Sequence, residues 1–321
     1  IKHCCVLSMW IAKIGFSDKK VLMRILFTIC YVLLYQFIWV EYCCDNFDYY
    51  GFTMIEYDFY EYIPTLFMAI CPILFYNGLL KISSIISIII YVFCYIPIIL
   101  SIFYMQNQNI NNCVFFTQFL VFLGMVSFFL SDRLVIRNMG YCRRIKKYSF
   151  KSLLWITLAI IIILIILYSP YMRLVSLSDV YDLREDSANI TGMGIVGYLV
   201  FWSSNAFVPF FFIYGLLKKK TLYVVLGFVC YVLLFMMTGQ KTNFFMPLIL
   251  YGFIVLLRYE RKGLPFYLLL ICSLVCISIL VFNLSDDFMI IKAIVFMRTL
   301  CIPGLLFVNY LDFFLTQRLI I

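Results

Sequence analysis

Two arginines lie close to several carboxylates in one polar stretch of the sequence, between two long apolar segments. Arg173 and Arg184 flank Tyr181 and Asp182, and Glu185 follows directly. A guanidinium presents a planar fork of N–H donors that fits a phosphate, and a carboxylate can take a proton from a hydroxyl group. This combination suits the transfer of a group carried on a phosphate. The alternative is a set of surface salt bridges, each contributing only about 0 to 1 kcal/mol.

A second polar cluster is the short turn Thr238–Thr242, which separates two strongly apolar segments. It contains Gln240 and Lys241, a hydrogen-bonding amide next to a cation. The alternative for Lys241 is an anchor whose aliphatic stem lies in lipid while its ammonium reaches water. Such an anchor would not require Gln240, so we predict that Gln240, Lys241 and Tyr181 bind substrate.

The third cluster begins at Arg298 and continues through Pro303-Gly304 to Tyr310 and Asp312. Because Pro-Gly interrupts an apolar stretch, the pattern predicts an interfacial or re-entrant segment near the C-terminus. A charge at membrane depth is costly unless it has a function. Arg298 is therefore a candidate catalytic residue together with Arg173, Arg184, Asp182 and Glu185, and Tyr310 and Asp312 are candidate substrate-binding residues.

The apolar segments that position these clusters dominate the composition, since 65% of the residues are hydrophobic and 13% are charged. A helix needs about 20 apolar residues to cross a bilayer, and only helices satisfy their backbone there within one segment. The sequence therefore predicts an all-α polytopic membrane protein with about nine complete spans. These are Val21–Tyr42, Ile63–Leu80, Ile85–Tyr104, Cys113–Ser131, Ser152–Ser169, Met193–Leu217, Thr221–Thr238, Asn243–Leu257 and Pro265–Phe282.

The apolar stretch Cys4–Phe16 is shorter, and we interpret it as the end of a further, partial span. Ile1 is then an internal residue of a longer natural protein. We expect residues 1–321 to form a single polytopic membrane domain, because the longest loops have about twenty residues and cannot bury a core of their own.

The orientation follows from Lys and Arg, which stay on the cytoplasmic side of short loops. Most of the 25 basic residues fall in every second loop, at Lys19, Lys20 and Arg24; Lys81; Arg133, Arg137, Arg143, Arg144, Lys146, Lys147 and Lys151; Lys218, Lys219 and Lys220; and Arg258, Arg261 and Lys262. The intervening outer loops cover about 43–62, 105–112, 170–192, 239–242 and 284–304. Cations that remain outside run against this bias and need a functional explanation; they are Arg173, Arg184, Lys241, Lys292, Arg298 and Arg318.

The formal net charge of +9 does not indicate a nucleic-acid partner, because topogenesis already explains the basic loops. The loop Asp132–Lys151 is expected to contact anionic lipid headgroups. Most of the 13 cysteines lie inside spans, where Cys acts as a small apolar residue. Cys43, Cys44, Cys113 and Cys301 are near the outer face, and the sequence leaves open whether they form disulfides. No metal site or cofactor is predicted.

The span organisation, the Met237–Thr242 turn, Arg298-Thr299, Ile302-Pro303-Gly304 and Tyr310–Phe314 together resemble bacterial O-antigen polymerases of the Wzy type, the oligosaccharide repeat unit polymerases. The resemblance covers nearly the whole chain. By position, the outer-loop arginines of the family correspond to Arg173, Arg184 and Arg298. Some members of the family carry an Arg and a Gly at a fixed spacing. Arg184 and Gly194 do not have this spacing, and the motif therefore supports no particular arginine in this chain.

The resemblance implies a glycosyltransferase-type enzyme at the outer face of the bacterial cytoplasmic (inner) membrane. Such polymerases join undecaprenyl-diphosphate-linked oligosaccharide repeat units into O-antigen or capsular-type polysaccharide, without a nucleotide sugar or a metal. The resemblance also implies a chain-length regulator and a flippase as protein partners, and contact with membrane lipid.

Other classes fit the residues less well. An O-antigen ligase or a membrane O-acyltransferase depends on a histidine, and the single histidine here is His3. A lipid-linked oligosaccharide flippase or another transporter, our alternative, would need internal repeats and polar residues midway through its spans. A purely structural protein would not explain cationic clusters in three outer segments. Another glycan transferase remains a further alternative.

Overall fold

The structure of the chain, a computed structural model, describes residues 18–76, 78–79, 82–105, 113–133, 150–175, 180–192, 194–260, 265–285 and 288–316. Within these ranges the regular secondary structure is entirely helical, and no strand is present. The predicted partial span Cys4–Phe16, most of the predicted outer loop 105–112 and Arg318 lie outside the described residues. The chain divides into two compact units, one of residues 1–137 and 264–321 and one of residues 138–263.

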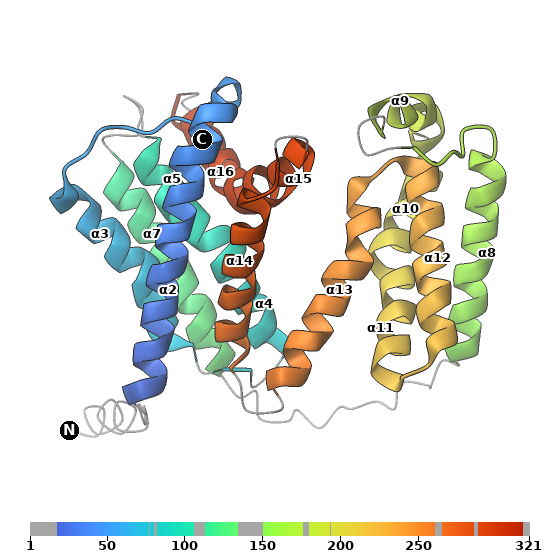
Figure 1. The fold of residues 1–321 in the computed structure, drawn as a ribbon, viewed down its shortest axis with the longest axis horizontal. Helices are drawn as coiled ribbons and strands as arrows, with labels where there is room; N and C mark the ends of the chain where they lie inside the picture. The colour runs from blue at the N-terminus through green and yellow to red at the C-terminus, as the bar shows by residue number, and fades with distance from the viewer. Residues whose placement is uncertain are drawn as a thin grey trace. The chain divides into compact units, whose positions relative to one another are not determined.

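The first unit is a bundle in which several long helices change from α to π or 3-10 geometry along their length (Figure 1). Helix α16 packs on α5, α14 packs on α2, and α3 packs on α5 and α7. The elements are α2 (Asp18–Ile38), η1 (Trp39–Cys44), η2 (Asp48–Tyr50), α3 (Phe59–Ile70), η3 (Cys71–Phe75), α4 (Ile82–Ile90), η4 (Tyr91–Tyr95), α5 (Ile96–Tyr104), α7 (Val114–Arg133), α14 (Phe266–Phe282), α15 (Met289–Lys292), η7 (Ala293–Cys301) and α16 (Ile302–Thr316).

Polar side chains inside the first unit bond to one another. Gln118 on α7 is buried and donates to the carbonyl of Ile99 over 2.9 Å, while its amide also meets the hydroxyl of Thr65. The hydroxyls of Tyr35 and Ser101 lie 3.0 Å apart. Such pairing is required at membrane depth, because no water is present there to satisfy a buried donor or acceptor.

The second unit packs four apolar helices side by side, of which one runs continuously through α10, η5 and α11, and places a polar helix across their ends (Figure 1). Its apolar helices are α8 (Phe150–Tyr168), α10 (Gly194–Trp202) with η5 (Ser203–Phe207), α11 (Val208–Lys218), α12 (Thr221–Thr238) and α13 (Lys241–Glu260). The core of this unit includes Leu164, Tyr168, Tyr231, Leu234 and Met237. Gly227 lets α11 and α12 approach closely, since a Cβ there would lie 2.9 Å from that of Phe212.

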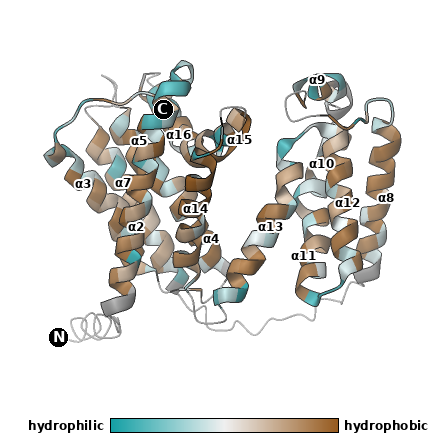
Figure 2. Cartoon of the chain, in the orientation of Figure 1, coloured by the Kyte–Doolittle hydropathy of each residue, from teal (hydrophilic) through white to brown (hydrophobic). Residues whose placement is uncertain are grey.

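The polar helix α9 (Val180–Thr191) interrupts the predicted outer loop 170–192 and contacts α8, α10 and α12. Val180, Leu183 and Ser187 are buried at helical spacing and form its inner face. The opposite face carries exposed carboxylates, so α9 lies on the bundle as an amphipathic cap. Figure 2 shows this contrast between the polar α9 and the hydrophobic helices beneath it.

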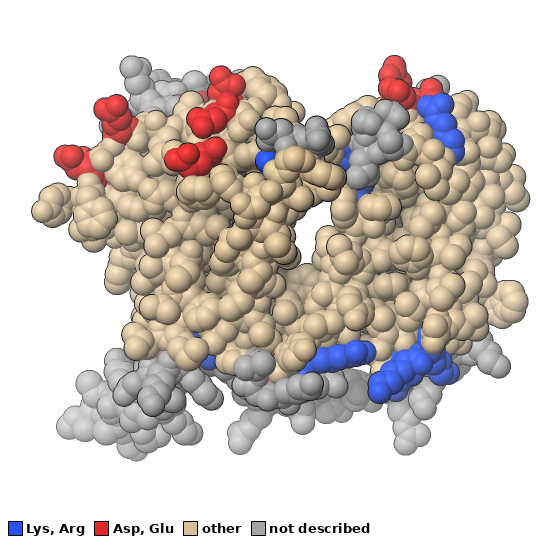
Figure 3. Space-filling view, viewed as in Figure 1, with Lys and Arg blue, Asp and Glu red and all other residues tan. Residues whose placement is uncertain are grey.

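Each of the nine predicted apolar runs forms a helix over most of its described residues, and this part of the chain is all-α with helices suited to spanning a membrane. Among the residues that the structure describes, seven helices are long and apolar enough to cross a bilayer: Val21–Cys44, Ser83–Tyr104, Val114–Asp132, Gly194–Lys218, Thr221–Thr238, Lys241–Glu260 and Met289–Leu315. Three predicted spans form shorter apolar helices: Phe59–Phe75, Ser152–Tyr168 and Phe266–Phe282. The number of nine spans therefore stays a prediction. On the visible face, Figure 3 shows acidic side chains at one end of each unit, and a broad uncharged zone along the helices.

The predicted interruption at Pro303-Gly304 is wrong, because the helix continues from Met289 through both residues to Thr316. Pro303 lies in the first turn of α16 directly after the π-helical η7, so its ring begins a segment rather than breaking one. Gly304 packs against α5, where an added Cβ would lie 2.7 Å from the carbonyl oxygen of Pro97 and closer still to the hydroxyl of Ser101. The glycine thus serves close packing between helices.

Candidate functional site

The candidate site is a group of side chains where α9 meets the turn between α12 and α13. Tyr181 and Arg184 lie one helical turn apart on α9, which holds them on the same side of that helix. Lys241 is the first residue of α13, directly after the turn formed by Gly239 and Gln240. The structure therefore brings together residues from two predicted clusters that are far apart in the sequence.

Arg184 is held by two contacts. Its Nε–H group donates to the carbonyl oxygen of Gly239 over 3.0 Å, and its guanidinium carbon lies 5.6 Å from the centre of the Tyr181 ring. The side chain is half-buried. Only one of its five N–H groups is used in this bond, and the others have no hydrogen-bond partner in the described part of the chain. A guanidinium held in this way keeps its donors available for an anion.

Lys241 approaches the same aromatic ring. Its ammonium nitrogen lies 4.9 Å from the centre of the Tyr181 ring, within the range of a cation–π interaction. Arg184 and Lys241 thus share one tyrosine, and among the described residues neither forms a salt bridge. Two cations near one ring repel each other, so an anion between them would relieve the repulsion. The two cations beside Tyr181 make this a candidate site for an anion such as a phosphate.

The turn that supports the site is ordered by hydrogen bonds around Thr238. The Thr238 hydroxyl donates to the carbonyl of Leu234 over 2.7 Å and accepts from the backbone N–H of Gln240 and the side-chain amide of Asn243, both over 3.3 Å. Gly239 adopts a positive φ of +60°, a conformation that glycine reaches without steric cost. These contacts fix the carbonyl to which Arg184 donates.

Sequence reasoning missed the roles of Gly239 and Asn243 in this turn. Asn243 is buried at the start of an otherwise apolar helix. A lone amide at the boundary of an apolar run was the available signal, because a buried amide needs partners. The role of the Gly239 carbonyl had no such signal, since every residue carries a carbonyl group.

The other charged residues of this loop behave differently. Arg173 forms a salt bridge to Asp186 with a separation of 2.7 Å, and both side chains are about half exposed (52% and 48%). For Arg173, the structure therefore shows the surface salt bridge that we gave as the alternative to a catalytic role. Asp182 and Glu185 are exposed on α9 and pair with no cation among the described residues, so either carboxylate is accessible to a ligand.

Arg298, Tyr310 and Asp312 belong to the first unit and do not form one cluster. Arg298 is exposed on η7, Tyr310 is exposed on α16 and Asp312 is half-buried. The twelve residues from Arg298 to Tyr310 span about 18 Å at the rise of a continuous helix. The same ligand atom therefore cannot touch Arg298 and Tyr310.

Among the described residues, no group of three or more His, Cys, Asp and Glu side chains is placed to hold a metal ion. The arrangement in the second unit instead offers organic cations and carboxylates for binding an anion and accepting a proton. Comparison of the chain with protein-family models, with curated proteins and with solved structures finds no match. The resemblance to Wzy-type polymerases therefore rests on the sequence motifs.

Proposed function

We propose that this protein is a membrane glycan polymerase that joins undecaprenyl-diphosphate-linked oligosaccharide repeat units at the outer face of the bacterial cytoplasmic membrane. The observation that supports this proposal best is the pair of cations, Arg184 and Lys241, on the ring of Tyr181. A lipid diphosphate is a small, multiply charged anion that two cations can bind together. The loops that carry both residues are those that the positive-inside pattern predicts to be outside.

In the proposed reaction, an acceptor hydroxyl oxygen forms a bond to the anomeric carbon of the donor glycan, while the bond from that carbon to the diphosphate oxygen breaks. Arg184 and Lys241 stabilise the negative charge that develops on the departing lipid diphosphate. Asp182 or Glu185 takes the proton of the acceptor hydroxyl. Tyr181 positions both cations, and Gln240 donates a hydrogen bond to the glycan.

Arg298 gives the proposal a second anion-binding position, on the first unit. Its exposed guanidinium lies on a helix of membrane-spanning length, where a charge near lipid interacts strongly with a phosphate. We assign Arg298 to a lipid-linked diphosphate, and Tyr310 and Asp312 to glycan contacts separate from that phosphate. A chain-length regulator and a flippase are the expected protein partners.

A lipid-linked oligosaccharide flippase is the second candidate function. Polar side chains inside the first unit favour it, in particular the buried Gln118 with Thr65 and the pair Tyr35 and Ser101. A transporter needs polar groups at membrane depth along its substrate path. These groups are bonded to one another, however, so they also serve as the internal hydrogen bonds that any helical bundle in lipid requires.

The test is the surface glycan of cells that lack the protein. A polymerase leaves a product with a single repeat unit and no polymer, whereas loss of all surface glycan built on this carrier would indicate the flippase. Complementation with Arg184→Ala or Lys241→Ala should leave the single-repeat pattern at normal protein level. Lys218→Ala, which removes a cation at the other end of the helices, should restore full polymer. Full polymer in both site variants would contradict the site.

A further inference from the structure

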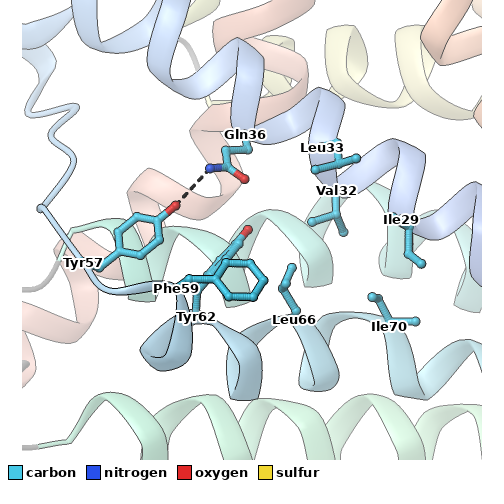
Figure 4. A pocket seen from close by; sticks show the side chains of 9 residues that line it. All are labelled: Ile29, Val32, Leu33, Gln36, Tyr57, Phe59, Tyr62, Leu66 and Ile70. Atoms are coloured by element: carbon cyan, nitrogen blue, oxygen red, sulfur yellow. Dashed lines mark hydrogen bonds between the residues drawn. The ribbon is translucent and has the colours of Figure 1, made fainter.

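An apolar groove opens between α2 and α3 in the first unit, with a volume of about 500 Å³ (Figure 4). Ile29 and Leu33 line it from α2, and Leu66 and Ile70 line it from α3. The floor is closed by Val32 and Tyr62, which are buried, whereas the wall at Leu33 is 59% exposed. The groove is therefore open along its length, and in a bilayer its opening faces hydrocarbon.

The helices α2 and α3 run in opposite directions, so the last lining residue of α2 lies beside the residues that precede α3. This gives the groove one polar end and one apolar end. Gln36 and Tyr57 meet at the polar end, while Ile29 and Ile70 lie at the other, as Figure 4 shows. The lining part of α3 runs over twelve residues, or about 18 Å at 1.5 Å per residue, which is slightly more than half of the 30 Å hydrocarbon thickness of a bilayer. This length matches one lipid chain in one leaflet.

The polar end offers a hydrogen-bond donor. The side-chain amide of Gln36 donates to the Tyr57 hydroxyl over 2.9 Å, so this hydroxyl acts as an acceptor and keeps its own proton to donate. An ordinary tyrosine hydroxyl keeps its proton at physiological pH, and burial raises the pKa of Tyr57 further. A lipid phosphate oxygen at the mouth of the groove would accept this hydrogen bond.

The charged residues that flank this end in the sequence are all acidic. Glu56, Asp58 and Glu61 are exposed next to Tyr57 and Phe59, and they form no ion pair with other described residues. The sequence has no Lys, Arg or His from residue 25 to residue 80. A headgroup that carries only negative charge is repelled by such a rim, whereas a headgroup with an ammonium next to its phosphate is attracted.

We propose that this α2–α3 groove binds one acyl chain of an aminophospholipid. The lipid phosphate accepts the hydrogen bond of Tyr57, the ammonium group lies among Glu56, Asp58 and Glu61, and the chain follows the groove to Ile29 and Ile70. This site is a specific lipid-binding site of the first unit. It does not depend on the proposed polymerase activity, and it also discriminates against the anionic lipid diphosphate.

The experiment measures which lipid stays bound to the purified full-length chain. The protein in detergent is incubated with equal amounts of phosphatidylethanolamine and phosphatidylglycerol with identical acyl chains, and the retained lipids are counted by native mass spectrometry. We expect one retained phosphatidylethanolamine, favoured over phosphatidylglycerol by about tenfold, or about 1.4 kcal/mol. Equal retention of the two lipids, or preferred retention of a polyprenyl diphosphate added as competitor, would overturn the proposal.

Two variants separate the acyl chain from the headgroup. Leu33→Trp fills the groove from its exposed wall and should lower retention of phosphatidylethanolamine about tenfold. Its control is Leu120→Trp on α7, which changes a similarly exposed leucine (51%) that does not line the groove and should retain the lipid. Glu56→Gln with Asp58→Asn should remove the preference between the two headgroups, whereas Asp48→Asn should keep it. Normal retention by Leu33→Trp, or an unchanged preference after Glu56→Gln with Asp58→Asn, would also overturn the proposal.

Discussion

Arg184 donates its Nε–H group to the carbonyl oxygen of Gly239 over 3.0 Å, and this bond connects α9 to the turn between α12 and α13. Lys241 follows the same turn, so the bond also places Arg184 beside the Tyr181 ring that Lys241 approaches. One hydrogen bond therefore links the attachment of α9 to the geometry of the candidate anion site.

Replacing Arg184 by Ala should loosen α9 and abolish polymer. A hydrogen bond from a charged group contributes about 1.5–3 kcal/mol, and hydrogen exchange of the α9 amides reports its loss directly. Arg184→Lys should recover little polymer, because an ammonium lacks the fork that binds Gly239 and a phosphate together. Arg173→Ala is the control, since its exposed salt bridge to Asp186 contributes only about 0 to 1 kcal/mol. Equal protection of α9 in wild type and Arg184→Ala would refute the link.

Gly239→Ala should destabilise the second unit by about 1 kcal/mol or more, because its φ of +60° is strained for a residue with a side chain. The new Cβ would also lie 3.0 Å from the carbonyl oxygen of Val180 and 3.2 Å from Cγ of Arg184. Gly252→Ala is the matched control, since a Cβ there meets no atom within 4 Å and alanine favours a helix. Thermal unfolding in detergent should rank Gly239→Ala well below Gly252→Ala, and a reversed ranking would contradict the prediction.

Gly304→Ala should separate α16 from α5 and destabilise the first unit by about 1–3 kcal/mol. The obstacle is partly backbone, because the carbonyl oxygen of Pro97 would lie 2.7 Å from the added Cβ. Ser101→Ala in the same chain should therefore restore only part of the stability. Gly124→Ala on α7 has open space around its Cβ and should be neutral or stabilising. If thermal unfolding shows Gly304→Ala to be neutral, the close packing assigned to this glycine is wrong.

The orientation of the chain can be tested with reporter fusions. The alternating loop charges predict that fusions after Glu56 and Asp182 are active outside, whereas fusions after Arg144 and Lys219 are active in the cytoplasm. Paired reporters, one active only outside and one only inside, provide the control at each position. A cytoplasmic signal at Asp182 would move Arg184 and Lys241 to the wrong face for the proposed reaction.

Arg298→Ala should abolish polymer while the single-repeat product still reaches the surface, because the proposal places a lipid diphosphate at this guanidinium. Arg298→Lys should keep part of the activity, since the charge remains while the fork is lost. Arg258→Ala is a suitable control, because that guanidinium bonds to the carbonyl of Leu216 in the second unit over 2.9 Å. Full-length polymer in Arg298→Ala would indicate an interfacial anchor.

The sequence by itself determined the class of protein and the position of its helices. Backbone groups in lipid must be bonded within their own segment, so a run of about 20 apolar residues has helix as its stable solution, whatever its neighbours are. This is why each of the nine predicted runs forms a helix over most of its described residues. For the same local reason, the predicted boundaries of Thr221–Thr238 agree with the structure.

The sharing of Tyr181 by Arg184 and Lys241 was decided only by the tertiary structure. No sequence pattern states that α9 folds across the ends of α10 and α12, because that depends on the burial of Val180 and Leu183 against other helices. Pro303-Gly304 shows the same limit from the opposite side. By its intrinsic helix propensity, this pair would break a helix. The close contact of Gly304 with Pro97 and Ser101 leaves no room for a side chain, however, and this packing is more favourable than the propensity is unfavourable.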